Sequence, residues 1–492
     1  MASLLLLILS PKGGDLDRSV LPAMAFIDPT GANRKEIAQL LNQVSQHLLD
    51  YLTDAAQQSP LPAADTPAVT LPDMPIAVGD LLQQLDQILA QSMNPAHPGY
   101  IGHMDPLPTT FSIIGDWLAA ALNNNMLSVE MSPVFSRLEP QLMAAIAQRF
   151  GLGPKAGGVL VSGGSLANLQ ALAVARNAKL GTLTAGLTTL PKPPVFFASA
   201  LAHSSIRKAA MLLGLGQEGV ISIPADEQGH MKIEALAAAI AQAKNQGQQP
   251  FAVVATAGTT VTGNIDPLPK IAAIAQQQDL WFHVDGAYGG ALAFSTRYRD
   301  RLKGIEQADS VTFNPQKWLY VAKTCASVLF RDMGKLQQHF QVAAPYMNAE
   351  ADWINLGEIS VQGTRHADVL KLWLSLQHLG LKGCEALIDA SYDLTKHFVA
   401  AIRQRPYLEL ATVPEMNVIC FRGCPEGRSP DAWNQDLQQY LLNIGNGFMS
   451  LPVYRQQRWL KAVLLNPFTT PAKIDQLFTH MDDFWRRSDH DR

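Results

Sequence analysis

Hydrophobic residues change their spacing along this chain, and the change separates two kinds of secondary structure. In the N-terminal part they recur at helical spacing, and we expect helices at 33–51, 78–91, 111–122 and 133–150. The segment 57–75 between the first two is rich in Pro, Ala and Thr, which predicts an extended linker. Two such helices cannot form a core alone, so we expect them to dock on a larger body or on a partner subunit.

A segment rich in proline and glycine, 94–110, excludes regular structure but carries polar side chains, among them His103 and Asp105. Long irregular segments with such side chains are more often functional than merely connecting. A plain surface loop is the alternative interpretation.

From Gly157 onward, short runs that are apolar throughout alternate with helical patterns. Six runs predict strands: GGVLV, PVFFAS, GVISI, FAVVAT, LWFHVD and SVTF. Continuous apolar strands separated by helices are typical of a parallel sheet covered on both faces. The pattern therefore predicts an α/β fold. Such sheets bind their ligands beyond the C-terminal ends of the strands.

Polar residues follow these predicted strand ends. After the first strand comes Gly163-Gly164-Ser165, which opens a helix and offers bare backbone N–H groups and a positive dipole end to a phosphate. A tight strand-to-helix turn explains the same glycines equally well. Thr256 ends the fourth strand, FAVVAT.

Asp285 ends the strand LWFHVD and precedes GAYGG, where small residues let a flat ligand approach. Its carboxylate is either a helix N-cap or the partner of a positively charged ring nitrogen. His203 precedes SSIRKAA and either caps that helix or stacks on the same ring.

Lys317 stands between two apolar runs, VTF before it and WLYV after it. A desolvated lysine has a lowered pKa and is a good amine for Schiff-base formation. A surface lysine on a turn is the alternative, because Asn314-Pro315 is a turn signal. A phosphate cradle, a carboxylate for a pyridinium and a Schiff-base lysine are together what pyridoxal phosphate (PLP) requires.

Composition and charge exclude several classes of partner and site. The chain has 492 residues, a formal net charge of -4 and no basic cluster interleaved with aromatic residues, so we expect no nucleic-acid partner. Four scattered cysteines lack metal-ligand spacing, which predicts free thiols, a cytoplasmic location and no metal site. The apolar run Leu4–Leu9 is far shorter than the ~20 residues that span a bilayer and lacks the basic region of a signal peptide. We interpret it as a loosely docked lead or an over-extended start, with no membrane association.

At these residues the sequence resembles the group II PLP-dependent amino-acid decarboxylases, which act on glutamate, aromatic amino acids, cysteine sulfinate or diaminobutyrate. The likeness runs from about His97 to the C-terminus. It is carried by HPGYIG, NNNMLSVEMSPVFSRLE, AHSSIRKA, TAGTTVTGNIDP, HVDGAYGG, FNPQKW and LNPFTT. The second and fourth of these motifs are more similar to the glutamate and diaminobutyrate branches than to the aromatic one.

The resemblance implies a PLP-dependent transferase-like fold of type I, with a mixed, mostly parallel sheet and flanking helices. It implies an N-terminal helical dimerisation segment at 1–95, a large PLP-binding domain at 96–375 and a small C-terminal α/β domain at 376–492. It also implies a homodimer with its active sites at the interface.

The resemblance further implies roles for individual residues. Lys317 is the Schiff-base lysine, Asp285 pairs with the ring nitrogen and His203 stacks on the ring, and these three are the expected catalytic residues. The expected cofactor-binding residues are Gly164, Ser165, His203, Thr256, Asp285, Ala287, Asn314, Gln316 and Lys317. The expected substrate-binding residues are His103, Asn124 and Lys461.

The sequence departs from the family pattern at three places. Gln316 stands where the family usually has a histidine, and Lys461 stands where it has an arginine that grips the substrate α-carboxylate; Arg458 is a possible substitute. The segment 347–365 contains no tyrosine, although the family normally brings one to the substrate α-carbon on a mobile loop, at a position near Ile354. Aldehyde as a side product is the expected consequence.

These features predict a carboxy-lyase that converts an L-amino acid to its amine and CO₂. His103, with Asn124, favours a small polar or acidic substrate such as glutamate, aspartate or cysteine sulfinate. Asp105 favours instead a cationic side chain such as that of diaminobutyrate. An aromatic decarboxylase, an aldehyde-forming enzyme, another PLP enzyme such as an aminotransferase, and a non-catalytic PLP-binding protein are the remaining alternatives.

Overall fold

The computed structural model describes residues 21–65, 69–343 and 353–490. The predicted N-terminal lead and residues 347–352 of the predicted loop lie outside these described residues. The chain divides into two compact units, Met1–His97 and Pro98–Arg492.

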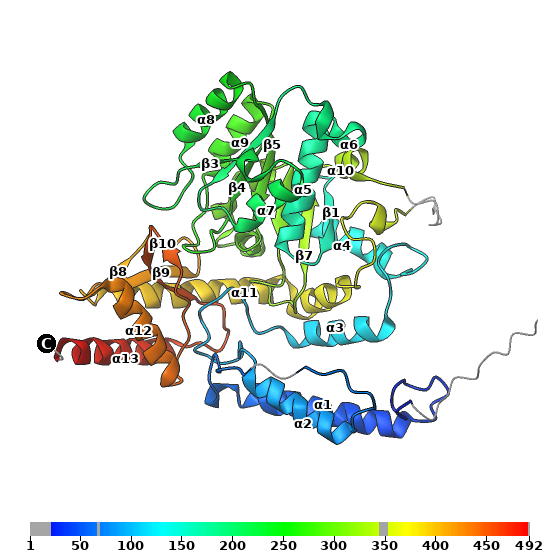
Figure 1. Cartoon of the computed structure of the whole chain (residues 1–492), viewed down its shortest axis with the longest axis vertical. Coiled ribbons are helices and arrows are strands. Elements are labelled where there is room, and N and C mark those ends of the chain that lie inside the picture. Colours follow the sequence, from blue (N-terminus) through cyan, green and yellow to red (C-terminus); the bar gives the residue numbers. More distant parts are fainter. Residues whose placement is uncertain (1–20, 66–68, 344–352, 491–492) are drawn as a thin grey trace, which may run out of the picture. The chain divides into compact units, whose positions relative to one another are not determined.

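The N-terminal unit is built on the two helices that the hydrophobic spacing predicted. Helix α1 spans Arg34–Thr53 and helix α2 spans Val78–Gln91, and the two lie side by side (Figure 1). The His47 imidazole of α1 and the Asp86 carboxylate of α2 are joined at 2.5 Å. A short 3₁₀ turn, η1 at Ala55–Gln57, starts the linker.

The second unit is organised around a seven-stranded sheet with the order β1-β7-β6-β5-β4-β2-β3. The strands are β1 (Gly157–Val161), β2 (Pro194–Ser199), β3 (Val220–Ile223), β4 (Gln249–Thr256), β5 (Trp281–Asp285), β6 (Ser310–Phe313) and β7 (Ala326–Phe330). All six predicted strands are present. Every residue of β1, β5, β6 and β7 is buried, so both faces of the sheet are covered.

Strand β7 is the one sheet member that the hydrophobic pattern did not identify. It pairs antiparallel with both β1 and β6, whereas the β2–β3, β2–β4, β4–β5 and β5–β6 pairs are parallel. The connection from β6 to β7 contains no helix, and a short return of this kind can join only antiparallel neighbours. The expected mixed, mostly parallel sheet is confirmed.

Helices flank the sheet, and Figure 1 shows α5 and α7 packed side by side against it. The helices up to the end of the large sheet are α3 (Thr110–Leu122), α4 (Phe135–Arg149), α5 (Gly164–Leu180), α6 (Thr182–Ala185), α7 (Ser204–Leu212), α8 (Ile233–Asn245), α9 (Leu268–Gln277) and α10 (Met333–Phe340). The predicted helices at 111–122 and 133–150 are confirmed as α3 and α4. Among the described residues, no helix is long and apolar enough to cross a membrane.

The C-terminal part has its own small antiparallel sheet, in the order β12-β9-β8. Its elements are β8 (Leu408–Leu410), β9 (Val418–Gly423), α12 (Pro430–Asn443), the hairpin β10–β11 (Val453–Tyr454 and Gln457–Arg458), β12 (Leu460–Val463) and α13 (Pro471–His490). A separate apolar core, which includes Phe398, Phe421 and Phe478, fills this part.

Helix α11 (Val369–Arg403) runs from the large sheet to the small one and is broken at Gly380, whose φ of 60° and ψ of 174° are not helical. The predicted domain boundary at 375/376 falls inside this helix. The three-part division therefore stays a prediction.

The start of the second unit is tied to the edge of the small sheet. The Val463 N–H donates to the Ile101 carbonyl at 2.6 Å, and the Ser450 hydroxyl donates to the Gly102 carbonyl at 2.7 Å. The His103 ring follows directly and lies 5.3 Å from the Phe448 ring, centre to centre. The irregular segment 98–109 is therefore held in place by backbone pairing, which positions its polar side chains.

Candidate active site

A cavity of about 370 Å³ lies beyond the C-terminal ends of the sheet strands. All nine residues predicted to bind the cofactor line it: Gly164, Ser165, His203, Thr256, Asp285, Ala287, Asn314, Gln316 and Lys317. They come from the first turn of α5, the start of α7, the ends of β4 and β5, and the loop after β6. The sheet thus brings together residues that lie more than 150 positions apart in sequence, while their roles stay predictions.

Lys317 lies in a tight loop after β6. Its N–H donates to the Asn314 carbonyl at 3.0 Å, and the neighbouring Gln316 side chain accepts the Cys325 N–H at 2.6 Å. Burial lowers the pKa of the Lys317 amine, while the nearby Asp285 and Asp105 carboxylates oppose the shift. The amine is therefore closer to its neutral, nucleophilic form than an exposed lysine would be.

Asp285 is the last residue of β5 and is almost fully buried. One of its oxygens accepts the Ala287 N–H at 3.1 Å, and the other accepts the Asn168 amide at 3.0 Å. The N-cap of the following 3₁₀ helix, η4 at Gly289–Phe294, is Tyr288 and not Asp285. The carboxylate is thus held in one orientation by two donors at the cavity wall.

His203 is the N-cap of α7, so the capping interpretation is confirmed. Its Nδ1 accepts the Ser205 N–H at 3.2 Å, and the ring also lines the cavity. Capping and facing the cavity are therefore compatible. Partial burial lowers the pKa of His203, and the positive charge of Lys317 lowers it further, against the opposing effect of Asp285.

The turn between β1 and α5 requires two glycines for different reasons. Gly163 has a φ of 146°, which disfavours any residue with a Cβ. A Cβ on Gly164 would lie 2.9 Å from the Asn314 amide nitrogen, so a side chain there would push into the cavity wall. The bare backbone at the start of α5 is thus left free to approach an anionic group.

Two polar atoms at the cavity test whether PLP fits. The Thr256 hydroxyl and the Asn314 side-chain oxygen are buried and have no hydrogen-bond partner within the described part of the chain. Buried polar groups are normally paired, so these two require a partner that the described residues do not supply. A cofactor with ring substituents and a phosphate provides such partners, and the donor set therefore fits PLP.

The predicted substrate residues are not all in one place. Lys461, on β12, is buried, and its ammonium donates to the carbonyl of Thr260, a cavity residue, at 3.5 Å. Burial lowers the pKa of Lys461 to about 8. The charge of Lys461 also lowers the pKa of His103, which places the two within electrostatic reach of each other.

Asn124 does not line the cavity within one chain. It follows the end of α3, and its amide donates to the Leu122 carbonyl at 3.1 Å. Arg458, the possible substitute for Lys461, is exposed on β11 and does not line the cavity either. The substrate role of Asn124 stays a prediction.

Asn168 and Ser205 are cavity residues that the sequence reading missed. Asn168 lies on the buried face of α5 and is fully buried, as is Ser205 in the first turn of α7. A polar residue on the apolar face of a helix is the signal that could have identified Asn168, because such a group must be hydrogen-bonded.

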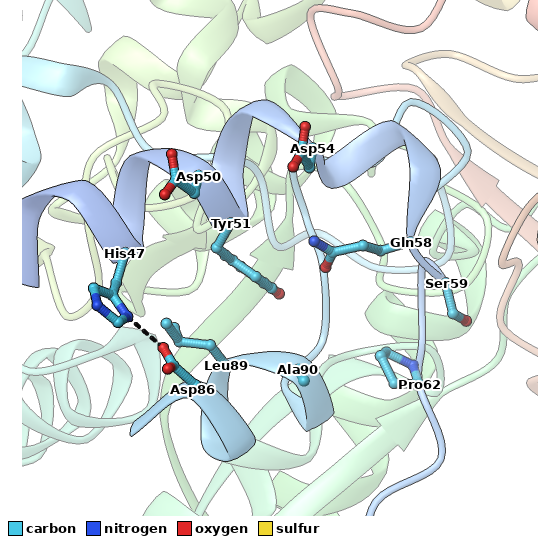
Figure 2. A pocket seen from close by; sticks show the side chains of 10 residues that line it. All are labelled: His47, Asp50, Tyr51, Asp54, Gln58, Ser59, Pro62, Asp86, Leu89 and Ala90. Carbon is cyan, nitrogen blue, oxygen red and sulfur yellow. Dashed lines mark hydrogen bonds and ion pairs between the residues drawn. The ribbon is translucent and has the colours of Figure 1, made fainter. Parts of the chain in front are cut away.

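A second cavity, of about 530 Å³, lies within the N-terminal unit (Figure 2). Its lining residues are His47, Asp50, Tyr51, Asp54, Gln58, Ser59, Pro62, Asp86, Leu89 and Ala90. Figure 2 shows the His47–Asp86 ion pair at one end of it. None of the predicted site residues is among them, so this cavity is not the candidate active site.

Comparison with known proteins agrees with the geometry. The family model of the pyridoxal-dependent decarboxylase conserved domain matches residues 61–423. The chain is 35% identical over 415 residues to L-2,4-diaminobutyrate decarboxylase of Rhizobium meliloti (strain 1021), an alignment that covers 83% of this chain and 82% of the relative. It is 34% identical over 425 residues to the acidic amino acid decarboxylase GADL1 of Xenopus tropicalis, covering 82% and 83%.

Among solved structures, mouse CSAD superposes with a TM-score of 0.87 at 29% identity, covering 93% of this chain and 99% of that one. The fold of type I that the resemblance implied is thereby confirmed. The matched residues 61–423 contain every lining residue of the candidate active-site cavity. The chain therefore belongs to the pyridoxal-dependent decarboxylase family and is a PLP-dependent amino-acid decarboxylase.

Proposed function

We propose that this enzyme removes the α-carboxyl group of a small acidic L-amino acid. The supporting observation is the balance of charge between the cavity and the small sheet. Lys461 and Lys323 both lower the pKa of His103, and Asp105 opposes the lowered pKa values of His103, Lys317 and Lys461. The Asp105 carboxylate is already paired with the Lys323 ammonium. A second carboxylate on the substrate would therefore meet a positive field.

When bound, PLP supplies an aldehyde for an amine and a protonated ring that withdraws electrons as CO₂ leaves. We assign the amine that holds it to Lys317, because burial lowers the pKa of that group. We assign Asp285 to the ring nitrogen, because two donors keep its carboxylate oriented. The backbone at Gly164 and Ser165, at the start of α5, is suited to the phosphate.

Lys461 is the proposed anchor of the departing carboxylate. It is buried beside the cavity, and its ammonium has only a 3.5 Å bond to the Thr260 carbonyl. A carboxylate offers this ammonium a charged partner that a carbonyl cannot match. Lysine holds one oxygen as a point charge, where an arginine would hold both through its fork.

The proton that returns to the substrate carbon is proposed to come from His203 or from a water held by it. Among the described lining residues the one tyrosine is Tyr288, whose hydroxyl donates to the Asn417 side chain at 2.7 Å. Burial raises the pKa of Tyr288 well above its usual value, so it is a poor acid. Ile354, where the family loop carries a tyrosine, packs against the main core and does not line the cavity.

The decisive experiment is CO₂ release from a panel of amino acids with the purified enzyme. We expect glutamate, aspartate or cysteine sulfinate to give the highest kcat/KM, and Lys323→Gln to lower it for these substrates. A preference for an aromatic amino acid would refute the proposal. No CO₂ from any substrate, with PLP bound, would indicate a binding protein or another PLP reaction.

Diaminobutyrate is the second candidate substrate. Asp105 supports it, and so does the similarity to a diaminobutyrate decarboxylase. This alternative requires Asp105 to exchange its partner Lys323 for the substrate ammonium. If it is correct, Asp105→Asn lowers kcat/KM for diaminobutyrate, whereas under the acidic proposal the same variant leaves kcat/KM for acidic substrates unchanged or raised.

We also propose a cytoplasmic homodimer. All four cysteines, which lie in the described part of the chain, are free thiols, as expected in a reducing compartment. Exposed apolar side chains on α3, among them Trp117, Leu118 and Leu122, are suited to an interface. Sedimentation of the purified enzyme tests the dimer, and a mass of one chain would refute it.

A further inference from the structure

Behind the cavity wall, a row of buried polar side chains links the core of the sheet to His203. Asn168 lies at its centre and makes four hydrogen bonds through one amide group. The hydrogen-bond chemistry of its neighbours fixes the position of every proton in the row.

The sheet end of the row begins at Trp281, whose indole can only donate. It donates to the Ser310 hydroxyl at 2.8 Å, and that hydroxyl lies 2.9 Å from Nδ1 of His283. The other ring nitrogen of His283, Nε2, lies 3.0 Å from the Asn168 side-chain oxygen. An amide oxygen can only accept, so His283 carries a proton on Nε2. Its Nδ1 lies 2.9 Å from the Ser310 hydroxyl and 3.2 Å from the Ser310 carbonyl; in the neutral ring it accepts from the hydroxyl, which is the closer of the two. Complete burial lowers the pKa of His283 to about 4 and keeps it neutral.

The cavity end of the row begins at the Asn168 amide nitrogen, which has two protons. One is donated to the Asp285 carboxylate at 3.0 Å and the other to the Ser205 hydroxyl at 2.9 Å. The Ser205 hydroxyl therefore donates its own proton to Nδ1 of His203, 2.9 Å away. The Ser205 backbone N–H also points to this Nδ1, at 3.2 Å. His203 thus accepts twice at Nδ1 and carries its proton on Nε2.

We propose that Asn168 is a positioning residue that orients the Asp285 carboxylate and, through the Ser205 hydroxyl, holds Nδ1 of His203 as an acceptor. The inference rests on the proposed function of these two residues at the cofactor. The Thr312 hydroxyl donates to the Asn168 side-chain oxygen at 2.7 Å. Reversing the amide would bring that oxygen against the Asp285 carboxylate. It would also leave the His283 N–H and the Thr312 hydroxyl without an acceptor. Only one orientation satisfies all neighbours, and that orientation points an amide donor at the Asp285 carboxylate and holds the Ser205 hydroxyl toward Nδ1 of His203.

Two substitutions at Asn168 distinguish a role of its amide hydrogen bonds from a role in packing alone. Asn168→Asp keeps the shape but puts a second carboxylate 3.0 Å from Asp285, so the pair must share a proton. Asn168→Leu removes the amide and leaves Ser205 free to turn away from His203. Asn177→Asp is the matched control, because Asn177 is buried in the same helix and bonds to Thr182 and the His339 carbonyl, away from the cavity.

The primary measurement is the ¹⁵N–¹H spectrum of the full-length enzyme with labelled histidine, with and without PLP. The signal of His203 is assigned by its loss in His203→Gln. We expect the Nε2–H form in wild type and in Asn177→Asp between pH 6 and 8. In both Asn168 variants we expect a displaced Nδ1 signal, because the Ser205 hydroxyl is no longer held toward Nδ1 and the Ser205 backbone N–H remains as its donor. The charged groups near His203 are Asp285, Lys317 and Lys208, and Asn168→Leu changes none of them, so this variant isolates the loss of the hydrogen-bonded path. Unchanged His203 nitrogen shifts in both Asn168 variants would overturn the proposal.

A second variant keeps the test valid if an Asn168 variant does not fold. Ser205→Ala removes the hydroxyl between Asn168 and His203 and should alter the His203 signal by itself. Combined with Asn168→Leu, it should add nothing further, because both changes break the same path. Additive effects on the His203 signal would mean that the two residues act independently, which also overturns the proposal.

Steady-state kinetics then tests whether the hydrogen bonds of Asn168 affect the reaction. In Asn168→Asp we expect kcat to fall by about tenfold or more with KM within about threefold, because the ring partner loses charge while substrate contacts remain. If wild type releases no CO₂ from any amino acid but the His203 signals behave as expected, the proposed function fails and the positioning role stands. A fall in kcat without any change at His203 would assign Asn168 a structural role and overturn the positioning role.

Discussion

Replacing Lys461 should change the pH at which the enzyme loses its substrate. Burial lowers the pKa of this lysine from 10.5 to about 8, a difference worth about 3 kcal/mol. The folded chain bears this cost at any pH below about 8, where the ammonium is charged and buried. It is offset when a carboxylate arrives to pair with the ammonium.

The sign of the pH effect follows from this shift. Above pH 8 the free enzyme loses the Lys461 proton, and with it the partner of the substrate carboxylate. Because kcat/KM reports the free enzyme, it should fall about tenfold per pH unit, or about thirtyfold by pH 9.5. Folding responds in the opposite direction, since the unfolded chain holds this proton up to about pH 10.5. The contribution of Lys461 to stability therefore improves between pH 8 and 10.5 while substrate binding fails.

The assay is kcat/KM from pH 6 to 9.5 for wild type, Lys461→Arg and Lys461→Met. The ratio of wild type to the arginine variant cancels the titration of the substrate amine and of the cofactor. An arginine stays charged throughout, so we expect this ratio to fall above pH 8. The methionine variant should be lower at every pH below 8 by about 2 kcal/mol, or about thirtyfold, since it leaves a buried carboxylate unpaired.

Arg458→Gln is the control, because Arg458 is exposed on β11 and should leave the profile unchanged. A wild-type to arginine ratio that stays flat to pH 9.5 would refute the reasoning. So would a loss of kcat/KM in Arg458→Gln with none in Lys461→Met, which would make Arg458 the carboxylate anchor.

Three further outcomes are expected. Lys317→Ala should abolish both the visible absorbance of lysine-bound PLP and all CO₂ release, and wild-type activity in this variant would contradict the central assignment. Asp285→Asn should lower kcat on the order of 10²-fold because the ring loses its anionic partner; a fall below about tenfold would mean that its bond to the Ala287 N–H is its main role. Wild type should yield measurable aldehyde and hydrogen peroxide beside the amine, and Ile354→Tyr should reduce both side products. If wild type yields only the amine and Ile354→Tyr changes nothing, position 354 has no role in the outcome of the reaction.

Much of the fold was predictable because its signals are local. Each apolar run from GGVLV to SVTF became a strand. Gly164, Thr256, Asp285 and Lys317 were identified because they lie at or just beyond strand ends, whereas Ala287, Asn314 and Gln316 were implied by the family resemblance. Parallel strands that share a direction bring their ends to one edge whatever their order in the sheet. The gathering of Asp285, Thr256 and Lys317 therefore needed no knowledge of strand order.

The direction of β7 and the role of Asn168 depend on which elements become neighbours in the fold, and no local sequence pattern carries that information. Strand β7 looks like any other apolar run, and only its pairing with both β1 and β6 gives it its direction. Asn168 acquires its role from the register of β5 and β6, which sets Asp285 beside Thr312. Both side chains then reach the same amide on α5.

Gln316 shows how a departure from the family pattern can be read once the contacts are known. Its side-chain oxygen accepts the Cys325 N–H at 2.6 Å, so the amide is anchored and its nitrogen is left to donate. The family histidine would offer a donor and, when protonated, a charge; Gln316 keeps the donor alone. Lys461 makes the reverse exchange, keeping the charge of the family arginine and giving up its fork. Gln316 thus retains the hydrogen-bond donor without the charge, and Lys461 retains the charge without the two-pronged hydrogen-bonding geometry of arginine. The contacts of the Gln316 amide should therefore be insensitive to pH, whereas the proposed carboxylate binding through Lys461 depends on it.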